Sequence, residues 1–129
     1  MSDSDRNRPL KILVVENHED TLRWLTLYLE ELGHTVAGAR TLAEARAALA
    51  TGEHEVLLSD IGLPDGTGWD LLESEPLSGR IFAIAMSGFG QNANSARSLA
   101  AGYRHHLIKP FKLSELERVL AEAAQQGAR

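Results

Sequence analysis

The chain has 129 residues, of which 43% are hydrophobic and 24% are charged, and its formal net charge is −5. It contains no cysteine, which excludes disulfides and thiolate metal sites. The acidic balance and the absence of a lysine- and arginine-rich block argue against direct binding of nucleic acid. No apolar run is long enough to span a bilayer and no signal-peptide pattern opens the chain, so we expect a cytoplasmic protein without membrane contact.

The length fits one domain of common size. Residues 1–9 are polar, and we expect them to form a disordered lead-in. Residues 10–125 carry the hydrophobic pattern of the domain, and residues 126–129 are predicted to be a tail. No linker, repeat or low-complexity segment interrupts the pattern, which leaves no room for a second domain within these residues.

Between its ends the sequence alternates apolar runs typical of strands with segments whose apolar residues fall at helical spacing. The run "LKILVVE" is continuously apolar and rich in β-branched residues, as in strands covered on both faces. Leucines at helical spacing follow it, and Gly33 ends that helix. Thr41 and Glu44 predict a capping box at the start of the next helix. We expect strands at 10–16, 34–39, 54–60, 80–88 and 105–109, each followed by a helix.

This repeated strand–helix order predicts an α/β fold. Strands that alternate with helices form a parallel sheet covered by helices on both faces. The crossovers are right-handed almost without exception. In such sheets the chemistry lies beyond the carboxyl ends of the strands, at the point where the strand order reverses.

Polar side chains follow four of the five predicted strands at this edge. They are Glu16 and Asn17, then Asp60, then Ser87, then Lys109. A carboxylate attacks phosphorus only where the charge of the incoming phosphoryl group is neutralised. Mg²⁺ held by carboxylates and a lysine ammonium supply that neutralisation, and a hydroxyl binds a further phosphate oxygen. The set therefore predicts a phosphoryl-acceptor site.

The motifs "VVEN", "LLSDIGLPDGTG", "AMSG" and "HLIKPF" occur in this order and resemble those of the receiver domain of two-component response regulators. The resemblance runs from about residue 11 to residue 124, and it is most similar to receivers attached to hybrid histidine kinases. It implies a flavodoxin-like (βα)5 three-layer sandwich with a parallel sheet of order 2-1-3-4-5.

The resemblance also implies roles for the strand-end residues. Asp60 corresponds to the phosphoacceptor, Lys109 to the phosphate-contacting lysine and Ser87 to the switch hydroxyl. The expected Mg²⁺ ligands are Glu16, Asn17, Asp60 and the backbone carbonyl of Gly62. His106 stands where an aromatic rotamer switch usually lies, and the bond before Pro110 is expected to be cis.

The function that follows from the resemblance is a phosphorylation-dependent switch. A histidine kinase or a histidine phosphotransfer protein gives its phosphoryl group to Asp60, and the output is binding of a partner protein or onward transfer in a phosphorelay. The chain then catalyses only its own phosphorylation and dephosphorylation, so it is not an enzyme acting on an outside substrate.

Asn17 departs from the family, which usually has an acidic residue at this position. An amide oxygen can coordinate Mg²⁺ but brings no charge, so we expect weakened Mg²⁺ affinity. The alternative function is a pseudo-receiver, a docking module whose metal-dependent phosphorylation is weakened or lost because of Asn17. Phe89 and Gly62 are further expected to tune the access of water to the phosphoryl group.

Other readings of these residues are weaker. Phosphatases with an aspartyl nucleophile carry a second aspartate two residues later, where this chain has Gly62. No glycine-rich nucleotide fingerprint follows the first strand. His105 and His106 are adjacent in a strand, point to opposite faces and so cannot bind one ion together. Trp24 and Tyr28 are expected to pack in the core or against a partner, and Asp65 and Asp70 are expected to serve the turn and a helix start.

Overall fold

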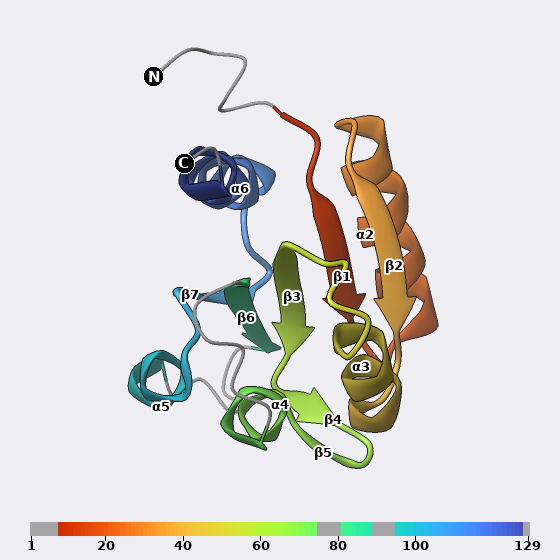
Figure 1. Ribbon diagram of the computed structural model, residues 1–129, viewed down its shortest axis with the longest axis vertical. Helices are drawn as coiled ribbons and strands as arrows, with labels where there is room; N and C mark the ends of the chain where they lie inside the picture. The colour runs from red at the N-terminus through yellow and green to blue at the C-terminus, as the bar shows by residue number, and fades with distance from the viewer. Residues whose placement is uncertain (1–7, 75–80, 89–94, 128–129) are drawn as a thin grey trace.

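The computed structural model describes residues 8–74, 81–88 and 95–127, and its centre is a five-stranded parallel sheet (Figure 1). The strand order is β2-β1-β3-β6-β7, so the five main strands run 2-1-3-4-5 in chain order and the predicted fold is confirmed. The strands are β1 (Lys11–Val15), β2 (Thr35–Ala39), β3 (Val56–Asp60), β6 (Phe82–Gly88) and β7 (His105–Lys109).

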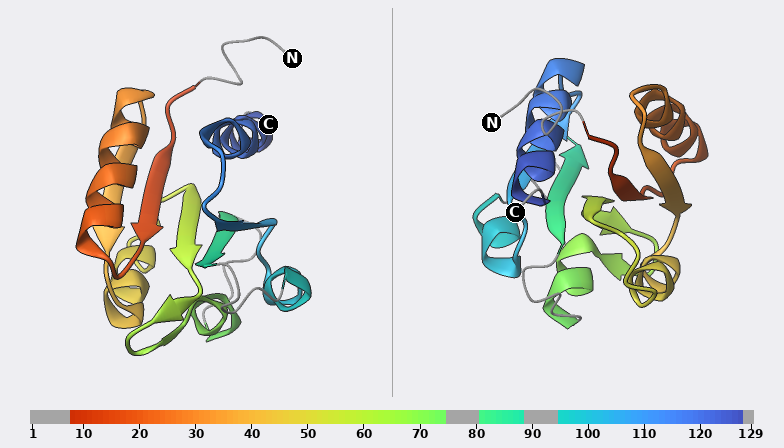
Figure 2. Two further views of the ribbon diagram at one scale, coloured as in Figure 1. Left: turned by 180° about the vertical axis from the view of Figure 1, so that it is seen from behind. Right: turned by 45° about the horizontal axis from the view of Figure 1, so that its top comes forward.

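Helices cover both faces of this sheet (Figure 2). One core cluster joins the sheet to α2 and α6, and Leu29 and Leu116 in it are fully buried. The other joins the sheet to α3, α4 and α5. The helices are α2 (Glu19–Glu31), α3 (Leu42–Leu49), α4 (Gly68–Ser74), α5 (Ser95–Ala101) and α6 (Leu113–Gly127).

The pattern of burial explains which strands lie in the centre. In β1 the four residues after Lys11 are buried, and in β3 all five residues are buried. These are the continuous apolar runs of the sequence, and both of their faces are covered by helices. The edge strands β2 and β7 are only partly buried; β2 carries mostly small side chains, and β7 carries two histidines and a lysine.

Local signals account for several helix ends. Gly33 follows α2 with φ of 102°, a left-handed conformation that favours glycine. Thr41 Oγ1 accepts a hydrogen bond from the Glu44 N–H at 3.0 Å, and the Glu44 carboxylate accepts one from the Arg40 N–H at 2.8 Å. The predicted capping interaction at the start of α3 is therefore present.

Three details differ from the expected elements. The loop after β3 contains a two-residue hairpin, β4 (Gly62–Leu63) paired with β5 (Gly66–Thr67). For the helix after β1 the sequence predicts a cap from Asp20 or a neighbouring residue, but α2 starts at Glu19 and its N-cap His18 makes no side-chain cap hydrogen bond. Helix α6 continues through residues 126 and 127, which the sequence assigned to the tail.

No helix in the described ranges is long and apolar enough to cross a membrane.

A hydrogen bond from Tyr28 joins α2 to α6, beside an aromatic pair that lies within α2. The rings of Trp24 and Tyr28 are stacked, with centroids 5.9 Å apart and planes at 7°. The Tyr28 hydroxyl donates a hydrogen bond to Glu117 of α6, and burial together with this carboxylate raises the pKa of Tyr28 to about 12. Trp24 is 49% exposed, whereas Tyr28 is partly buried and packs against the core cluster of this face.

Candidate functional site

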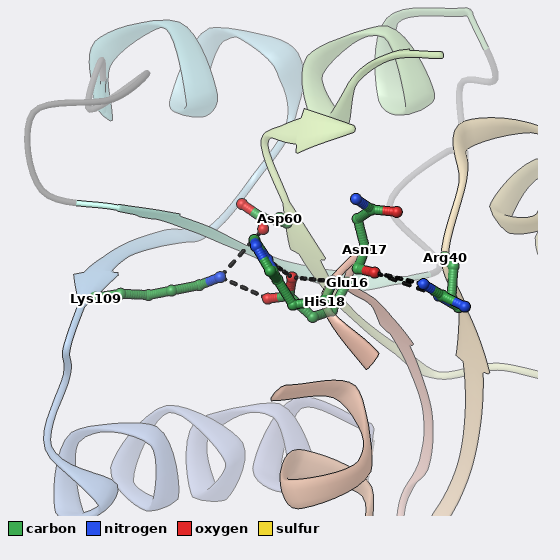
Figure 3. A network of polar contacts seen from close by, with 6 residues as sticks. All are labelled: Glu16, Asn17, His18, Arg40, Asp60 and Lys109. Carbon is green, nitrogen blue, oxygen red and sulfur yellow. Dashed lines mark hydrogen bonds and ion pairs between the residues drawn. The ribbon is translucent and has the colours of Figure 1, made fainter. Parts of the chain in front are cut away.

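Three charged side chains meet where β1, β3 and β7 end. The Lys109 ammonium donates hydrogen bonds to Glu16 Oε1 at 2.5 Å and to Asp60 Oδ2 at 3.1 Å. Figure 3 shows the Lys109 side chain reaching across the strand ends to both carboxylates. Since the strands are parallel, their carboxyl ends share one edge of the sheet, and this brings the three residues together.

The two carboxylates differ in their surroundings. Burial disfavours the Glu16 anion, but hydrogen bonds from Lys109 and from the His18 N–H outweigh it and lower the pKa of Glu16. Burial raises the pKa of Asp60; Lys109 opposes this shift and the negative charge of Glu16 adds to it. Burial lowers the pKa of Lys109, yet its bonds to Glu16 and Asp60 outweigh burial and raise it. The site thus favours the charged forms of Glu16 and Lys109 and disfavours the Asp60 anion.

The backbone around Asp60 is held by neighbours on both sides. The Ile61 N–H donates to the Met86 carbonyl of β6 at 2.9 Å, and Ser59 Oγ donates to the Asp60 carbonyl at 2.9 Å. Gly68, the first residue of α4, approaches so closely that a Cβ there would lie 2.6 Å from the Asp60 carbonyl oxygen. The "PDGTG" loop therefore ends in a glycine because α4 packs directly against the backbone of Asp60.

Asn17 lies at the same edge but is held through its backbone. Its carbonyl accepts two hydrogen bonds from the Arg40 guanidinium, at 3.1 and 3.3 Å. In Figure 3 its side chain points away from Lys109. Arg40 stands just after β2, so this contact ties the edge strand to the loop that follows β1.

The donor set can be compared with the needs of a divalent cation. Glu16 and Asp60 offer charged oxygens, and Asn17 offers a neutral amide oxygen. Within the described ranges, no three His, Cys, Asp or Glu residues gather to hold a metal ion. Mg²⁺ typically takes one or two carboxylates and completes its shell with water and phosphate oxygens, and this set fits that requirement.

Ser87 and His106 form a second group next to the charged one. Ser87 follows Met86, the register partner of Asp60, and its hydroxyl lies 2.7 Å from His106 Nε2. His106 Nδ1 lies 2.6 Å from the hydroxyl of Ser98 in α5. Burial lowers the pKa of His106, which favours its neutral form. The two residues predicted to act in switching are therefore in direct contact.

The remaining residues singled out in the sequence lie around the edge of the site or away from it. Gly62 lies in β4, beside the end of β3, and the Lys109–Pro110 peptide bond is cis as expected. Phe89 lies outside the described residues. His105 faces the opposite side of β7 from His106, and its Nε2 lies 3.1 Å from Glu122 Oε1 in α6.

The two aspartates assigned to turns have that role. The Asp65 carboxylate accepts hydrogen bonds from the N–H groups of Leu42 and Ala43 at 2.7 and 3.0 Å, and thus caps α3 from the loop that follows β3. These backbone bonds lower the pKa of Asp65. Asp70 and Thr67 bond reciprocally to each other's N–H groups at the start of α4.

Sequence reasoning did not find Arg40, Ser98 or Trp69. Arg40 follows a short edge strand, Ser98 falls in a weakly patterned helix and Trp69 follows a turn glycine. No local motif marks any of them. Their contacts join elements distant in the chain, and only the folded arrangement reveals them.

Comparisons with known proteins show the family to which the fold belongs. The family described as "Response regulator receiver domain" matches residues 12–121. "Transcriptional regulatory protein HprR" of Escherichia coli is 28% identical over 120 residues, which are 92% of this chain and 54% of that protein. "Two-component response regulator PhoP" of Pseudomonas aeruginosa is 32% identical over 109 residues, 84% of this chain and 48% of that protein. The chain spans about half the length of these relatives.

A solved structure supports the fold. The response regulator receiver domain protein from Clostridium thermocellum superposes with a TM-score of 0.84. The alignment covers 92% of this chain and 97% of that one at 22% identity. At this identity the likeness establishes the shared architecture alone.

Proposed function

The chain belongs to the family of response regulator receiver domains, and from this premise we propose that it is a phosphorylation-dependent signalling switch whose phosphoacceptor is Asp60. The observation that carries the proposal is the Lys109 ammonium, which bridges Glu16 and Asp60 at the carboxyl edge of the sheet. The donor is the phosphohistidine of a histidine kinase or a histidine phosphotransfer protein. The similarity to receivers attached to hybrid histidine kinases stays a prediction.

In the proposed transfer an Asp60 carboxylate oxygen attacks phosphorus. The new O–P bond forms as the N–P bond of the donor breaks, and the nitrogen of the donor imidazole takes the bonding electron pair. In the unphosphorylated protein Lys109 donates a hydrogen bond to Asp60 Oδ2 and so keeps positive charge beside the attacking carboxylate.

The residues around Asp60 can neutralise the negative charge of the incoming phosphoryl group. The Lys109 ammonium is positioned to bind a phosphoryl oxygen once Asp60 carries the acyl phosphate. Bound Mg²⁺, held by Glu16, Asp60, Asn17 and the Gly62 carbonyl, would supply further positive charge to the phosphoryl oxygens. Ser87 stands beside Asp60 on β6 and offers a hydroxyl to one of these oxygens.

A mass measurement tests the proposal. The protein is incubated with Mg²⁺ and a small acyl-phosphate donor, and its intact mass is recorded. We expect a gain of one phosphoryl group in the wild-type protein and in Asp20→Asn, whose exposed aspartate lies in the first turn of α2. We expect no gain in Asp60→Asn. A phosphoryl group that persists in Asp60→Asn would overturn the assignment.

One observation favours a second candidate, a pseudo-receiver used for docking. Asn17 leaves the site with two carboxylates, and the Arg40 guanidinium holds the backbone of Asn17 from the side of β2. Under this alternative the wild-type protein gains no phosphoryl group in the same assay, whereas Asn17→Asp does. Partner capture that is equal with and without the donor would then support docking alone.

A further inference from the structure

Four side chains form a hydrogen-bonded chain behind the candidate phosphoacceptor. The Trp69 indole N–H donates to Ser98 Oγ at 2.9 Å, and the Ser98 hydroxyl lies 2.6 Å from His106 Nδ1. His106 Nε2 in turn lies 2.7 Å from Ser87 Oγ. The chain thus runs from α4 through α5 and β7 to β6, and Trp69, Ser98 and Ser87 are all buried.

The direction of the chain follows from its first member. An indole nitrogen can only donate, so Ser98 Oγ accepts from Trp69 and keeps its own proton to give away. Among the residues that the structure describes, His106 Nδ1 is the acceptor within reach of that proton. When Ser98 donates to Nδ1, the neutral imidazole carries its proton on Nε2 and donates it to Ser87.

This direction decides what Ser87 can do. If His106 Nε2–H donates to Ser87 Oγ, the Ser87 hydroxyl still has its proton to offer. In the opposite tautomer Ser87 gives its proton to Nε2 and presents only lone pairs. A phosphoryl oxygen is an acceptor, so it can bind the Ser87 hydroxyl directly only in the first case.

We propose that Ser98 and Trp69 are positioning residues that fix the Nε2–H tautomer of His106, so that the Ser87 hydroxyl stays available to a phosphoryl oxygen on Asp60. The proposal rests on the proposed function, since it names residues that prepare the same site. It adds a role for α4 and α5: their buried polar side chains orient the switch hydroxyl before any phosphoryl group arrives. Phosphorylation would then extend the hydrogen-bonded chain by one member without breaking the Ser87–His106 contact.

The tautomer can be measured without phosphorylation. In protein labelled with ¹⁵N at histidine, long-range proton–nitrogen spectra distinguish Nε2–H from Nδ1–H, and loss of the signals in His106→Asn assigns them. We expect a single Nε2–H form in the wild-type protein and a mixture with Nδ1–H in Ser98→Ala. Ser95→Ala, which changes an exposed serine of the same helix, should match the wild-type protein.

A second variant keeps the test decisive should Ser98→Ala fold poorly. Trp69→Phe leaves both partners of His106 in place. It removes the indole N–H that sets the direction of these hydrogen bonds, together with part of the buried ring. The Nδ1–H form should appear there too. An Nδ1–H form in the wild-type protein, or an unchanged Nε2–H form in both variants, would overturn the proposal.

Phosphorylation rates test the consequence for Ser87. With a small acyl-phosphate donor, Ser98→Ala should slow phosphorylation roughly two- to tenfold, the range expected for one hydrogen bond. In a Ser87→Ala background, Ser98→Ala should have no further effect, because the hydroxyl that it orients is absent. Equal rates for the wild-type protein and Ser98→Ala would overturn the positioning role alone, whereas failure of the wild-type protein to be phosphorylated would overturn the proposed function itself.

Discussion

Lys109 and Glu16, 93 positions apart in the chain, lie in direct contact, with the ammonium 2.5 Å from a fully buried carboxylate oxygen. The contact joins the two ends of the domain at one edge of the sheet. It also means that Lys109 neutralises a buried anion in the unphosphorylated protein. A lysine assigned to phosphate binding therefore has a structural task as well.

This double role predicts a loss of stability in Lys109→Met. Glu16 would remain buried without its cation, and breaking such a pair from one side costs about 3 kcal/mol in the free energy of unfolding. Urea unfolding at neutral pH measures the loss, with the exposed Lys112→Met as the control. Because the pKa of Glu16 is lowered, the stability from this pair is present above its unfolded value of 4.5 and is lost as the pH falls through the folded value. The difference between the wild-type protein and Lys109→Met should therefore shrink in acid, and a difference independent of pH would contradict this account.

Asp60 should behave in the opposite way. Burial and the nearby charge of Glu16 raise its pKa, so its ionisation is unfavourable in the folded protein. A raised pKa gives stability that is present below the unfolded value of 3.8 and lost as the pH rises through the folded value. Asp60→Asn should therefore be more stable than the wild-type protein at neutral pH. Urea unfolding without Mg²⁺ measures the free energy of unfolding, with Asp20→Asn as the control. A lower free energy of unfolding in Asp60→Asn would contradict the unfavourable ionisation of Asp60.

Particular residues show how far the sequence leads. Glu16, Asp60 and Lys109 could be predicted to meet because each follows an apolar run that reads as a strand, and the carboxyl ends of parallel strands share one edge. The core strands β1 and β3 were equally clear, since both are apolar throughout. The sheet order came from the resemblance of the motifs, because periodicity alone does not order strands.

The supporting contacts could not be predicted in this way. Asp65 reads as a turn residue, and nothing near it in the chain indicates that it caps α3, 23 positions earlier. Ser98 and Trp69 are 29 positions apart and belong to short helices whose packing against β7 depends on the whole fold. Such contacts depend on how the elements pack together, which no spacing along one segment encodes.

The Asn17 position leads to a prediction about metal affinity. Replacing its amide with a carboxylate in Asn17→Asp restores one negative charge among the oxygen donors, and Mg²⁺ prefers charged oxygen. We expect Mg²⁺ to bind about tenfold more tightly, which corresponds to roughly 1.4 kcal/mol. Titration followed by tryptophan fluorescence or calorimetry measures this. Asp20→Asn, which removes a charge from the first turn of α2 and no expected ligand, should change the Mg²⁺ affinity little. Equal Mg²⁺ affinities of the wild-type protein and Asn17→Asp would show that Asn17 does not weaken the binding of Mg²⁺.

His34 leads to a prediction far from the site. Its Nδ1 accepts a hydrogen bond from the Leu10 N–H at 3.0 Å, just before β1, and burial lowers its pKa. A histidine whose folded pKa is depressed stabilises the protein above its unfolded value of 6.5, and that stability is lost as the pH falls through the folded value. Protonation of Nδ1 also removes the acceptor for Leu10, so the free energy of unfolding of the wild-type protein should fall by about 1 kcal/mol on acidification through this window.

The pKa of His106 is lowered as well, so the contribution of His34 is isolated as the difference between the wild-type protein and His34→Gln. The exposed His18→Gln is the control. Urea unfolding at several pH values should show a shallower loss in His34→Gln alone, and parallel curves for all three proteins would show that the Leu10 contact does not depend on protonation.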